Sequence, residues 1–272
     1  MSSLCCYFGI SRTAYYKREK SVERELLEEG VVLDLVHSVR RDMPRLGGRK
    51  LYHLLYDDLQ SLGKIGRDKF FALLSKNDLL VERKRSYTKT TNSFHHYRRW
   101  KNQLKSLELT HSNQAWGSDI TYLRTVGGFV YLSLITDLHS RKIVGYSLSR
   151  SLSVEGSIEA LKMALRGSKN RQQQVIHHSD RGIQYCCHAY VGLLQKNNIL
   201  ISMTEDNHCY ENSKSERVNG ILKDEFYLDS TFNNFEQAFS AVRSAVKTYN
   251  ERRPHWALQL RTPHQVHIDE VA

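Results

Sequence analysis

The pattern of hydrophobic positions changes about one third of the way along the chain. Up to residue 81, apolar side chains recur three and four residues apart, as they do on one face of a helix. Stretches with this spacing begin at Val32, Leu51 and Phe70. Gly47-Gly48 and Gly63 lie between these stretches, where we expect them to end helices. The first third of the chain is therefore predicted to be all-helical.

The first residues of this region have the outline of a helix-turn-helix. Gly9 can supply the positive φ of a tight turn, and Ser11 is a good N-cap for the helix that follows. We therefore expect a short helix-turn-helix in residues 1–28 and a second helical DNA-binding region in residues 29–81.

Beyond residue 113 the pattern is that of short strands, which then alternate with helices. Three consecutive strands are predicted at 115–124, 129–136 and 143–149, and later strands at 175–178 and 199–203. Helices are predicted at 154–165, 182–197 and 211–226. This order indicates an α/β core with a mixed sheet in residues 113–228. An amphipathic stripe from Phe235 to Tyr249 predicts a C-terminal helix and tail, residues 229–272, that packs on the core.

A basic linker is expected between these regions, in residues 82–112, where hydrophobic periodicity fades. Its aromatic side chains can either stack on bases or dock on the neighbouring domain, and docking is the preferred interpretation. These aromatic residues are Tyr87, Phe94, Tyr97 and Trp100.

The positive charge is concentrated in the first third. Residues 1–105 contain 22 Lys and Arg against 12 Asp and Glu, whereas residues 106–272 contain 18 against 17. This asymmetry favours a polyanionic partner, above all nucleic acid, over a merely solvated basic face. The residues expected to contact phosphates are Arg40, Arg41, Arg45, Arg49, Lys50, Arg83, Lys84 and Arg85. Those near residues 40–50 can instead cap helix C-termini.

Several classes of protein are disfavoured. No stretch approaches the ~18 apolar residues of a membrane span, and there is no signal-peptide cleavage site. Five cysteines without a C-x-x-C motif argue against a disulfide framework or a zinc ribbon. We therefore expect a reduced, cytoplasmic protein. The phosphate-binding motif of nucleotide hydrolases is absent from the sequence.

Three acidic residues stand where catalytic carboxylates are often found. Asp119 lies inside the first strand, Asp180 directly follows the fourth, and Glu216 lies on a helix. The separation of Asp180 and Glu216 alone is uninformative, since chance provides about one such pair in a chain of this composition. Their settings, however, allow three carboxylates to converge on one point.

Convergent carboxylates without a rich set of His or Cys suit a hard divalent cation, Mg²⁺ or Mn²⁺. Two such ions can activate an attacking oxygen and stabilise a leaving one at a phosphodiester. Lys223 shares a helix face with Asn212 and Glu216, which suits it to hold the DNA backbone, although it can equally be a solvated lysine. His177 and His178 are interpreted mainly as hydrogen-bonding supports, and Asp137 as a turn residue.

At these residues the chain resembles the catalytic subunit of the insertion-sequence-three family of DDE transposases. The matching stretches begin at Asn113 (NQAWGSDITY), His177 (HHSDRGIQY), Ser202 (SMT), Glu211 (ENSKSERVNGILK) and Tyr249 (YNERRPH), and Arg45 to Arg49 (RLGGR) matches the family's helical DNA-binding segment. The resemblance implies an RNase H-like, retroviral integrase-type core. It also implies that Asp119, Asp180 and Glu216 bind metal, with His178 and Asn212 in support. Glu211 and Ser213 depart from the family's usual Asp and Ala.

The resemblance further implies an activity and partners. The enzyme would cleave at the ends of its own element and join the freed 3′-hydroxyl to a new phosphodiester. It would act on DNA as a homo-oligomer, with a companion protein encoded upstream and often fused by frameshifting. The competing hypotheses are a non-catalytic DNA-binding regulator from a decayed element and a plain nuclease that cleaves without joining.

Overall fold

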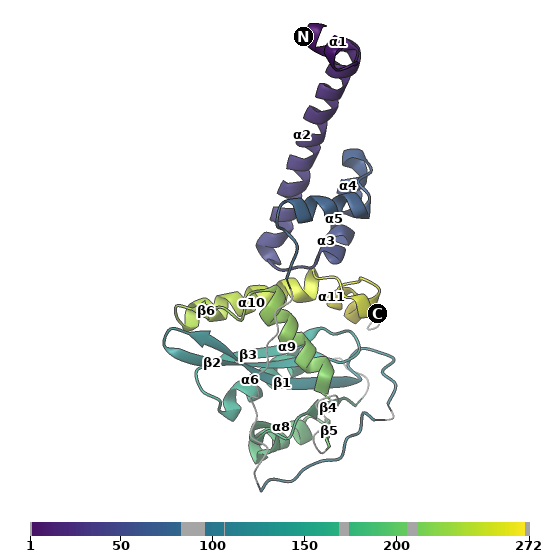
Figure 1. Cartoon of the computed structure of the whole chain (residues 1–272). Helices are drawn as coiled ribbons and strands as arrows, with labels where there is room; N and C mark the ends of the chain where they lie inside the picture. The colour runs from purple at the N-terminus through teal and green to yellow at the C-terminus, as the bar shows by residue number, and fades with distance from the viewer. Residues whose placement is uncertain (1, 83–95, 106, 169–173, 206–211, 270–272) are drawn as a thin grey trace. The chain divides into compact units, whose positions relative to one another are not determined.

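The computed structural model describes residues 2–82, 96–105, 107–168, 174–205 and 212–269. They form two compact units, Met1–Arg83 and Lys84–Ala272 (Figure 1). None of the described helices is long and apolar enough to span a membrane. Of the residues singled out in the sequence, those outside the described parts are Arg83, Lys84, Arg85, Tyr87, Phe94 and Glu211.

The first unit is helical, as the hydrophobic pattern predicts. Its helices are α1 (Ser2–Tyr7), α2 (Arg12–Asp42), α3 (Gly48–Leu54), α4 (Tyr56–Gly63) and α5 (Arg67–Lys76). The turn before α2 uses the expected residues: Gly9 has φ 65°, and Ser11 Oγ accepts a hydrogen bond from Ala14 N at 3.0 Å. Because α2 continues without a break for 31 residues, the expected division between 1–28 and 29–81 falls inside this helix.

Two helix boundaries in this unit differ from the sequence-based expectation. Gly47 and Gly48 begin α3 rather than end a helix. The packing explains why glycine stands there, because a Cβ on Gly48 would lie 3.1 Å from the ring of Phe71. The stretch from Leu51 to Leu62 is also divided into α3 and α4 at Leu55. Gly63 does end a helix, as expected.

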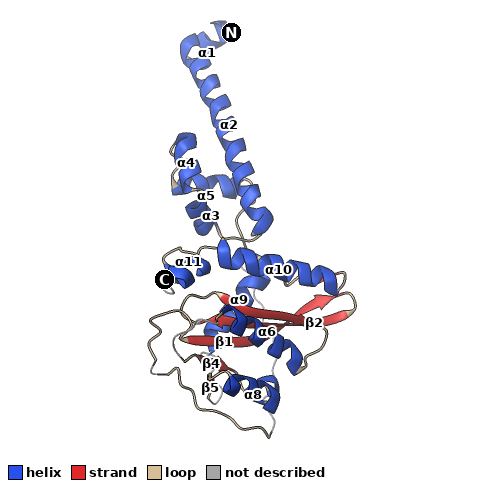
Figure 2. Cartoon of the chain, turned by 180° about the vertical axis from the view of Figure 1, so that it is seen from behind, coloured by secondary structure: helices blue, strands red, loops and turns tan. Residues whose placement is uncertain are grey.

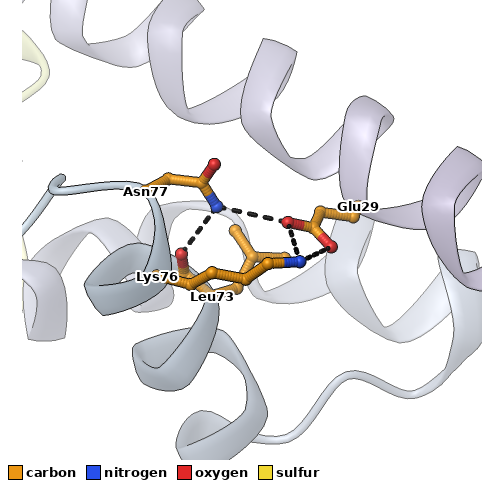
Figure 3. Close-up of polar contacts among 4 residues, drawn as sticks. All are labelled: Glu29, Leu73, Lys76 and Asn77. Atoms are coloured by element: carbon orange, nitrogen blue, oxygen red, sulfur yellow. Dashed lines mark hydrogen bonds and ion pairs between the residues drawn. The ribbon is translucent and has the colours of Figure 1, made fainter.

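A polar contact joins α2 to α5 in this unit (Figure 3). Lys76 Nζ donates to both carboxylate oxygens of Glu29, at 2.9 and 3.0 Å. Asn77 Nδ2 donates to Glu29 Oε1 at 3.2 Å and to Leu73 O at 2.9 Å. The first half of α2 is open to solvent: among residues 12–27, all are exposed except Tyr15, which is half-buried.

In the described residues of the second unit, six strands form a mixed sheet in the order β3-β2-β1-β4-β5, with β6 paired to β1. The antiparallel strands are β1 (Ala115–Thr125), β2 (Gly128–Asp137) and β3 (Ile143–Ser149). The strands β4 (Ile176–Ser179), β5 (Leu200–Met203) and β6 (Thr231–Phe232) join it in parallel pairings. The predicted order of strands and the mixed sheet are confirmed.

Helices cover both faces of this sheet (Figure 2). On one face, α6 (Val154–Gly167) packs on β2 and β3, and α8 (His188–Lys196) contacts β5. Gly145 permits this packing, because a Cβ there would lie 2.2 Å from Ala160 O. On the other face, α9 (Ser213–Glu225) packs on β1 and β2, and α10 (Phe235–Glu251) reaches β1 and β3. The expected helix at 182–197 is two helices, α7 (Ile183–Cys186) and α8, because Cys187 is extended. The chain ends in a short 3₁₀ helix (Trp256–Leu258) and α11 (Pro263–Asp269).

Side-chain amides cover part of the backbone of both outer strands. Asn250 Oδ1 accepts from Ile143 N at 2.9 Å, and its Nδ2 donates to Ile143 O at 3.0 Å, on β3. Gln103 Nε2 donates to Ile201 O at 3.1 Å on β5. Gln103 belongs to the segment preceding β1, whose Tyr97 and Trp100 pack against the core. The docking interpretation is therefore confirmed for these two aromatic residues.

Candidate active site

The parallel pairing of β1 with β4 brings two of the three predicted carboxylates near one another. Gly117 is the register partner of His178. Asp119 lies two residues beyond Gly117 on β1, and Asp180 lies two residues beyond His178, directly after the end of β4. Both side chains are half-buried. The β-sheet therefore brings together two residues that are 61 positions apart in the sequence.

Helix α9 brings the third carboxylate to this face. A Cβ on Gly117 would lie 2.2 Å from Ser215 Oγ and 2.6 Å from Leu138 Cδ2, so the absence of a side chain lets α9 approach β1 closely. Asn212, the N-cap of α9, donates its Nδ2 to Ser118 O at 3.2 Å. Glu216 lies one turn beyond Asn212 and is exposed.

The charges of the three carboxylates interact with one another. Burial, the negative charge of Asp180 and that of Glu216 raise the pKa of Asp119 to about 7, against the opposing effect of hydrogen bonds from Asn219 and Ile120 N. Burial and the charge of Asp180 likewise raise the pKa of Glu216. Neighbouring carboxylates are therefore close enough to Asp119 and to Glu216 to disfavour the ionised forms of these two residues.

Direct hydrogen bonds hold the two aspartates. Asn219 Nδ2 donates to Asp119 Oδ2 at 2.8 Å, and Ile120 N donates to Asp119 Oδ1 at 2.9 Å. Gly182 N donates to Asp180 Oδ1 at 2.9 Å, which closes a tight turn after β4. In each case one oxygen is held by the protein backbone, and this restricts the orientation of the carboxylate.

Lys223 lies two turns beyond Glu216 and is half-buried rather than freely solvated. Its Nζ stands 4.5 Å from the centre of the Tyr122 ring, a cation–π contact. Burial lowers the pKa of Lys223, while the charges of Asp119 and Asp229 act in the opposite direction. A cation is therefore positioned on the same helix as Glu216 and within the electrostatic reach of Asp119.

Comparison with known proteins identifies the family. Two models of the integrase core domain match residues 110–209 and 197–263. The uncharacterized 31 kDa protein of insertion element IS600 from Shigella sonnei is 34% identical over 257 residues, 93% of each chain. The chain belongs to the IS3 family of DDE transposases.

Further relatives of this transposase support its fold. Transposase InsF for insertion sequence IS3A of Escherichia coli (strain K12) is 38% identical over 144 residues, 53% of this chain and 50% of that protein. A chain of the simian T-cell lymphotropic virus intasome matches with a TM-score of 0.50 at 16% identity, covering 82% of this chain and 71% of that one. The core of the transposase thus has the retroviral integrase-type, RNase H-like fold that was expected.

The carboxylate oxygens of the transposase are the donors that Mg²⁺ and Mn²⁺ prefer. Raised pKa values of neighbouring carboxylates indicate a negative potential that a cation would neutralise. Within the described parts of the chain, however, no three His, Cys, Asp or Glu side chains already stand as a metal-binding group. The three residues thus fit a divalent cation by the chemistry of their oxygens, but their side chains are not yet arranged as a metal-binding group.

The two histidines before Asp180 form different contacts. His177 Nε2 lies 2.6 Å from Ser118 Oγ and 2.9 Å from the hydroxyl of Tyr190, and burial lowers the pKa of His177 to about 3. His178 Nδ1 lies 2.9 Å from Ser202 Oγ, which links β4 to β5. Both imidazoles are buried within hydrogen-bonded networks of the core, a location typical of supporting residues.

Asp137 has the structural role that its turn position suggested. Its Oδ1 accepts hydrogen bonds from Ser140 N at 2.7 Å and from Ser140 Oγ at 2.8 Å. Its Oδ2 accepts from Asn113 N at 2.6 Å. Asp137 is completely buried, and it organises the connection between β2 and β3.

The basic residues predicted to contact DNA from the first unit differ in their surroundings. Arg40 donates to Leu79 O at 2.6 Å, and Arg45 donates to Glu82 O at 2.8 Å. These bonds fasten the segment that follows α5. Arg41 and Arg49 are exposed, and Lys50 is half-buried. Phosphate contact by these residues stays a prediction.

Asn219 is a site residue to which sequence reasoning assigned no role. It lies three residues after Glu216 and seven after Asn212, so it shares their helix face. This periodicity was the available signal, but it does not reveal the partner. The bond from Asn219 to Asp119 joins residues 100 positions apart.

Proposed function

We propose that this transposase cleaves DNA at the ends of its own insertion sequence and joins the freed 3′-hydroxyl to a new phosphodiester. Asp119, Asp180 and Glu216 are the proposed metal ligands. The observation that carries the proposal is the electrostatic effect of these carboxylates on one another, where Asp119 on β1 and Asp180 after β4 lie near Glu216 on α9. Membership of the transposase family supports the same chemistry.

Each residue has a defined task in this proposal. Asp119 and Asp180 direct carboxylate oxygens outward from neighbouring positions of the sheet, and Glu216 adds a third from α9. When bound, two Mg²⁺ or Mn²⁺ ions would activate the attacking oxygen and neutralise charge at the scissile phosphate. The side chain of Glu216 is exposed and can move toward the aspartates once a cation offsets their repulsion.

Lys223 is proposed to bind the DNA backbone beside the carboxylates. Its position over Tyr122 restricts the lysine side chain before DNA arrives. A restrained ammonium loses less side-chain entropy when it contacts a phosphate. The excess positive charge of the first unit would supply further phosphate contacts, so that DNA affinity falls steeply as salt concentration rises.

We also propose that the active form is a homo-oligomer on DNA. In this proposal, separate copies of the chain hold the two ends of one element during cleavage and joining. An upstream companion protein, encoded in an overlapping frame, is the other proposed partner. Sequencing of the DNA that flanks the gene would reveal the inverted repeats and the overlapping frame on which this proposal depends.

The deciding experiment uses oligonucleotides with the DNA sequence that flanks this gene, incubated with the full chain and Mg²⁺ or Mn²⁺. We expect both cleaved strands and joined products. Asp180→Asn and Glu216→Gln should each reduce the rate about 10³-fold, because the loss of a charged ligand removes several kcal/mol of transition-state stabilisation. Glu236→Gln, at an exposed acid of α10, is the matched control and should leave the rate unchanged.

The competing functions predict different products. A non-catalytic regulator would bind the same DNA with or without Mg²⁺ and cut nothing. A plain nuclease would release cleaved strands without joining them. Unchanged rates in both carboxylate variants would show that the assignment of metal ligands is wrong.

A further inference from the structure

The far end of the helix that carries Glu216 is fastened by a buried ion pair. Arg253 follows α10, and its Nε donates to Glu225 Oε2 at 2.8 Å while Nη2 donates to Glu225 Oε1 at 2.7 Å. The Arg253 side chain is 2% exposed and that of Glu225 17%. This two-point geometry fixes the orientation of both side chains. Glu225 is the last residue of α9, so the pair acts on the end of that helix.

Arg253 is connected to the sheet through its neighbours at the end of α10. Its guanidinium lies 5.7 Å from the centre of the Tyr249 ring. Tyr249 donates its hydroxyl to Arg141 O at 3.0 Å, and Asn250 makes two hydrogen bonds to the backbone of Ile143. Hydrogen bonds and a ring contact therefore connect β3, through the end of α10, to Arg253 and its partner Glu225.

The stability of the fold does not explain why an ion pair stands here. Burying two charges costs desolvation energy that their attraction offsets only in part, and apolar residues of similar size often stabilise a protein as well or better. Helix α9 already buries Val218, Ile221 and Leu222 against the core. A two-point contact differs from an apolar contact in that it permits only one rotation and one height of the helix.

That restriction matters for Glu216. A slip of α9 by one residue would turn it by about 100° and shift it by about 1.5 Å, which would direct Glu216 away from the aspartates. At the other end, α9 is held by the bond from Asn212 to Ser118 O and by the contact of Ser215 with Gly117. The ion pair is a second fixed point, about 13 Å along the helix from Glu216.

We propose that Arg253 and Glu225 are positioning residues, which hold α9 at the rotation and height at which Glu216 faces Asp119 and Asp180. This inference rests on the proposed function, because it assigns Glu216 to the metal site. Neither residue touches the reacting atoms. The C-terminal helix thereby contributes to the active site without supplying a ligand.

The test replaces the ion pair by an apolar pair, Arg253→Met with Glu225→Leu, in the full chain. Urea unfolding measures stability, electron paramagnetic resonance measures Mn²⁺ binding without DNA, and oligonucleotide cleavage measures activity. We expect an unfolding midpoint close to that of the parent and an Mn²⁺ Kd raised about 10–100-fold, as for other residues that orient metal ligands. Cleavage should fall through kcat, with the KM for DNA unchanged. The matched control, Arg150→Met with Glu236→Leu, removes an exposed ion pair and should alter none of these quantities.

A second variant keeps the test decisive if the apolar pair does not fold. Arg253→Lys preserves the charge but loses the two-point contact, and we expect it to fold and to bind Mn²⁺ several-fold more weakly. A parental Mn²⁺ Kd in whichever of these variants folds would overturn the positioning role. If the parent itself bound no Mn²⁺ and cut no DNA, the proposed function would fail instead, and the two failures are thus distinguishable.

Discussion

The two units of the transposase place their polar contacts differently. In the first unit the contacts that join helices lie at the surface, as between Glu29 and Lys76. In the second unit many polar groups are buried, among them Asp137, His177 and Arg253. A surface ion pair is weak and tolerates rearrangement, whereas a buried polar group requires one arrangement of partners.

This difference corresponds to the two proposed tasks. A unit that binds phosphates needs positive charge at its surface, where many arrangements of Lys and Arg side chains can contact phosphates equally well. A unit that holds three carboxylates near one another needs a fixed geometry and must tolerate their repulsion. Substitutions in the second unit should therefore have larger and more specific effects than comparable ones in the first.

The largest effect is expected at Asp137. Asp137→Ala removes the acceptor for Ser140 N, Ser140 Oγ and Asn113 N and leaves buried donors without a partner. We expect a loss of about 3–5 kcal/mol in the free energy of unfolding, measured with urea. Asp137→Asn keeps the shape and should lose less. If Asp137→Ala were as stable as the parent protein, the buried polar contacts of the second unit would not contribute more to stability than the surface contacts of the first.

A smaller loss is expected for Gly117→Ala. The added methyl group would overlap Ser215 and Leu138, so α9 must move away from β1. Overpacking of this kind costs about 1–3 kcal/mol. Because α9 carries Glu216, Mn²⁺ binding should weaken as well. Gly127→Ala, at an exposed position with open space around it, is the control, and equal stabilities of the two variants would contradict the close approach of α9.

Asp119→Asn should stabilise the metal-free protein at alkaline pH. The folded state raises the pKa of Asp119 from 3.8 to about 7, so the protonated carboxyl is favoured and stability is lost as the pH rises through this range. The amide removes that loss. We expect equal stabilities near pH 4 and a gain of about 1–2 kcal/mol at pH 8, since solvent screens part of the repulsion.

The measurement for Asp119→Asn is urea unfolding across this pH range in the presence of a chelator. The same variant should cut no DNA. A parent protein that was more stable than the variant at pH 8 would show that the carboxylates do not repel one another as described.

The smallest effect is expected at Glu29 in the first unit. Hydrogen bonds from Lys76 and Asn77 lower the pKa of Glu29, so its stabilising effect is present at neutral pH and lost as the pH falls below the ordinary range of a carboxyl. Glu29→Gln should shift the urea midpoint only slightly, and the shift should diminish in high salt. A shift as large as that of Asp137→Ala would contradict the contrast between the units.

The sequence was most informative where one local signal decided the structure. The Trp, Ile, Thr and Tyr residues around Asp119 predicted β1, and the order of strands and helices predicted a mixed sheet, whereas the parallel pairing of β1 with β4 came from the structure. Helix boundaries were harder to predict. Gly47-Gly48 is compatible with either end of a helix, and the contact of Gly48 with Phe71 that decides between them is not local.

The rest of the site depends on contacts between distant residues. Asn219 reaches Asp119 across 100 positions, and Arg253 reaches Glu225 across 28. Single residues show no pattern from which such partners can be deduced. The settings of the three acids in the sequence and the resemblance to the family singled them out, whereas the geometry that supports them had to come from the structure.

The amides at the two outer strands have a consequence for how copies of this protein can meet. A bare strand edge would invite another chain to extend the sheet, which is a common route to aggregation. Asn250 and Gln103 use backbone groups that such an added strand would need. Copies of this protein are thereby discouraged from fusing their sheets at these two edges.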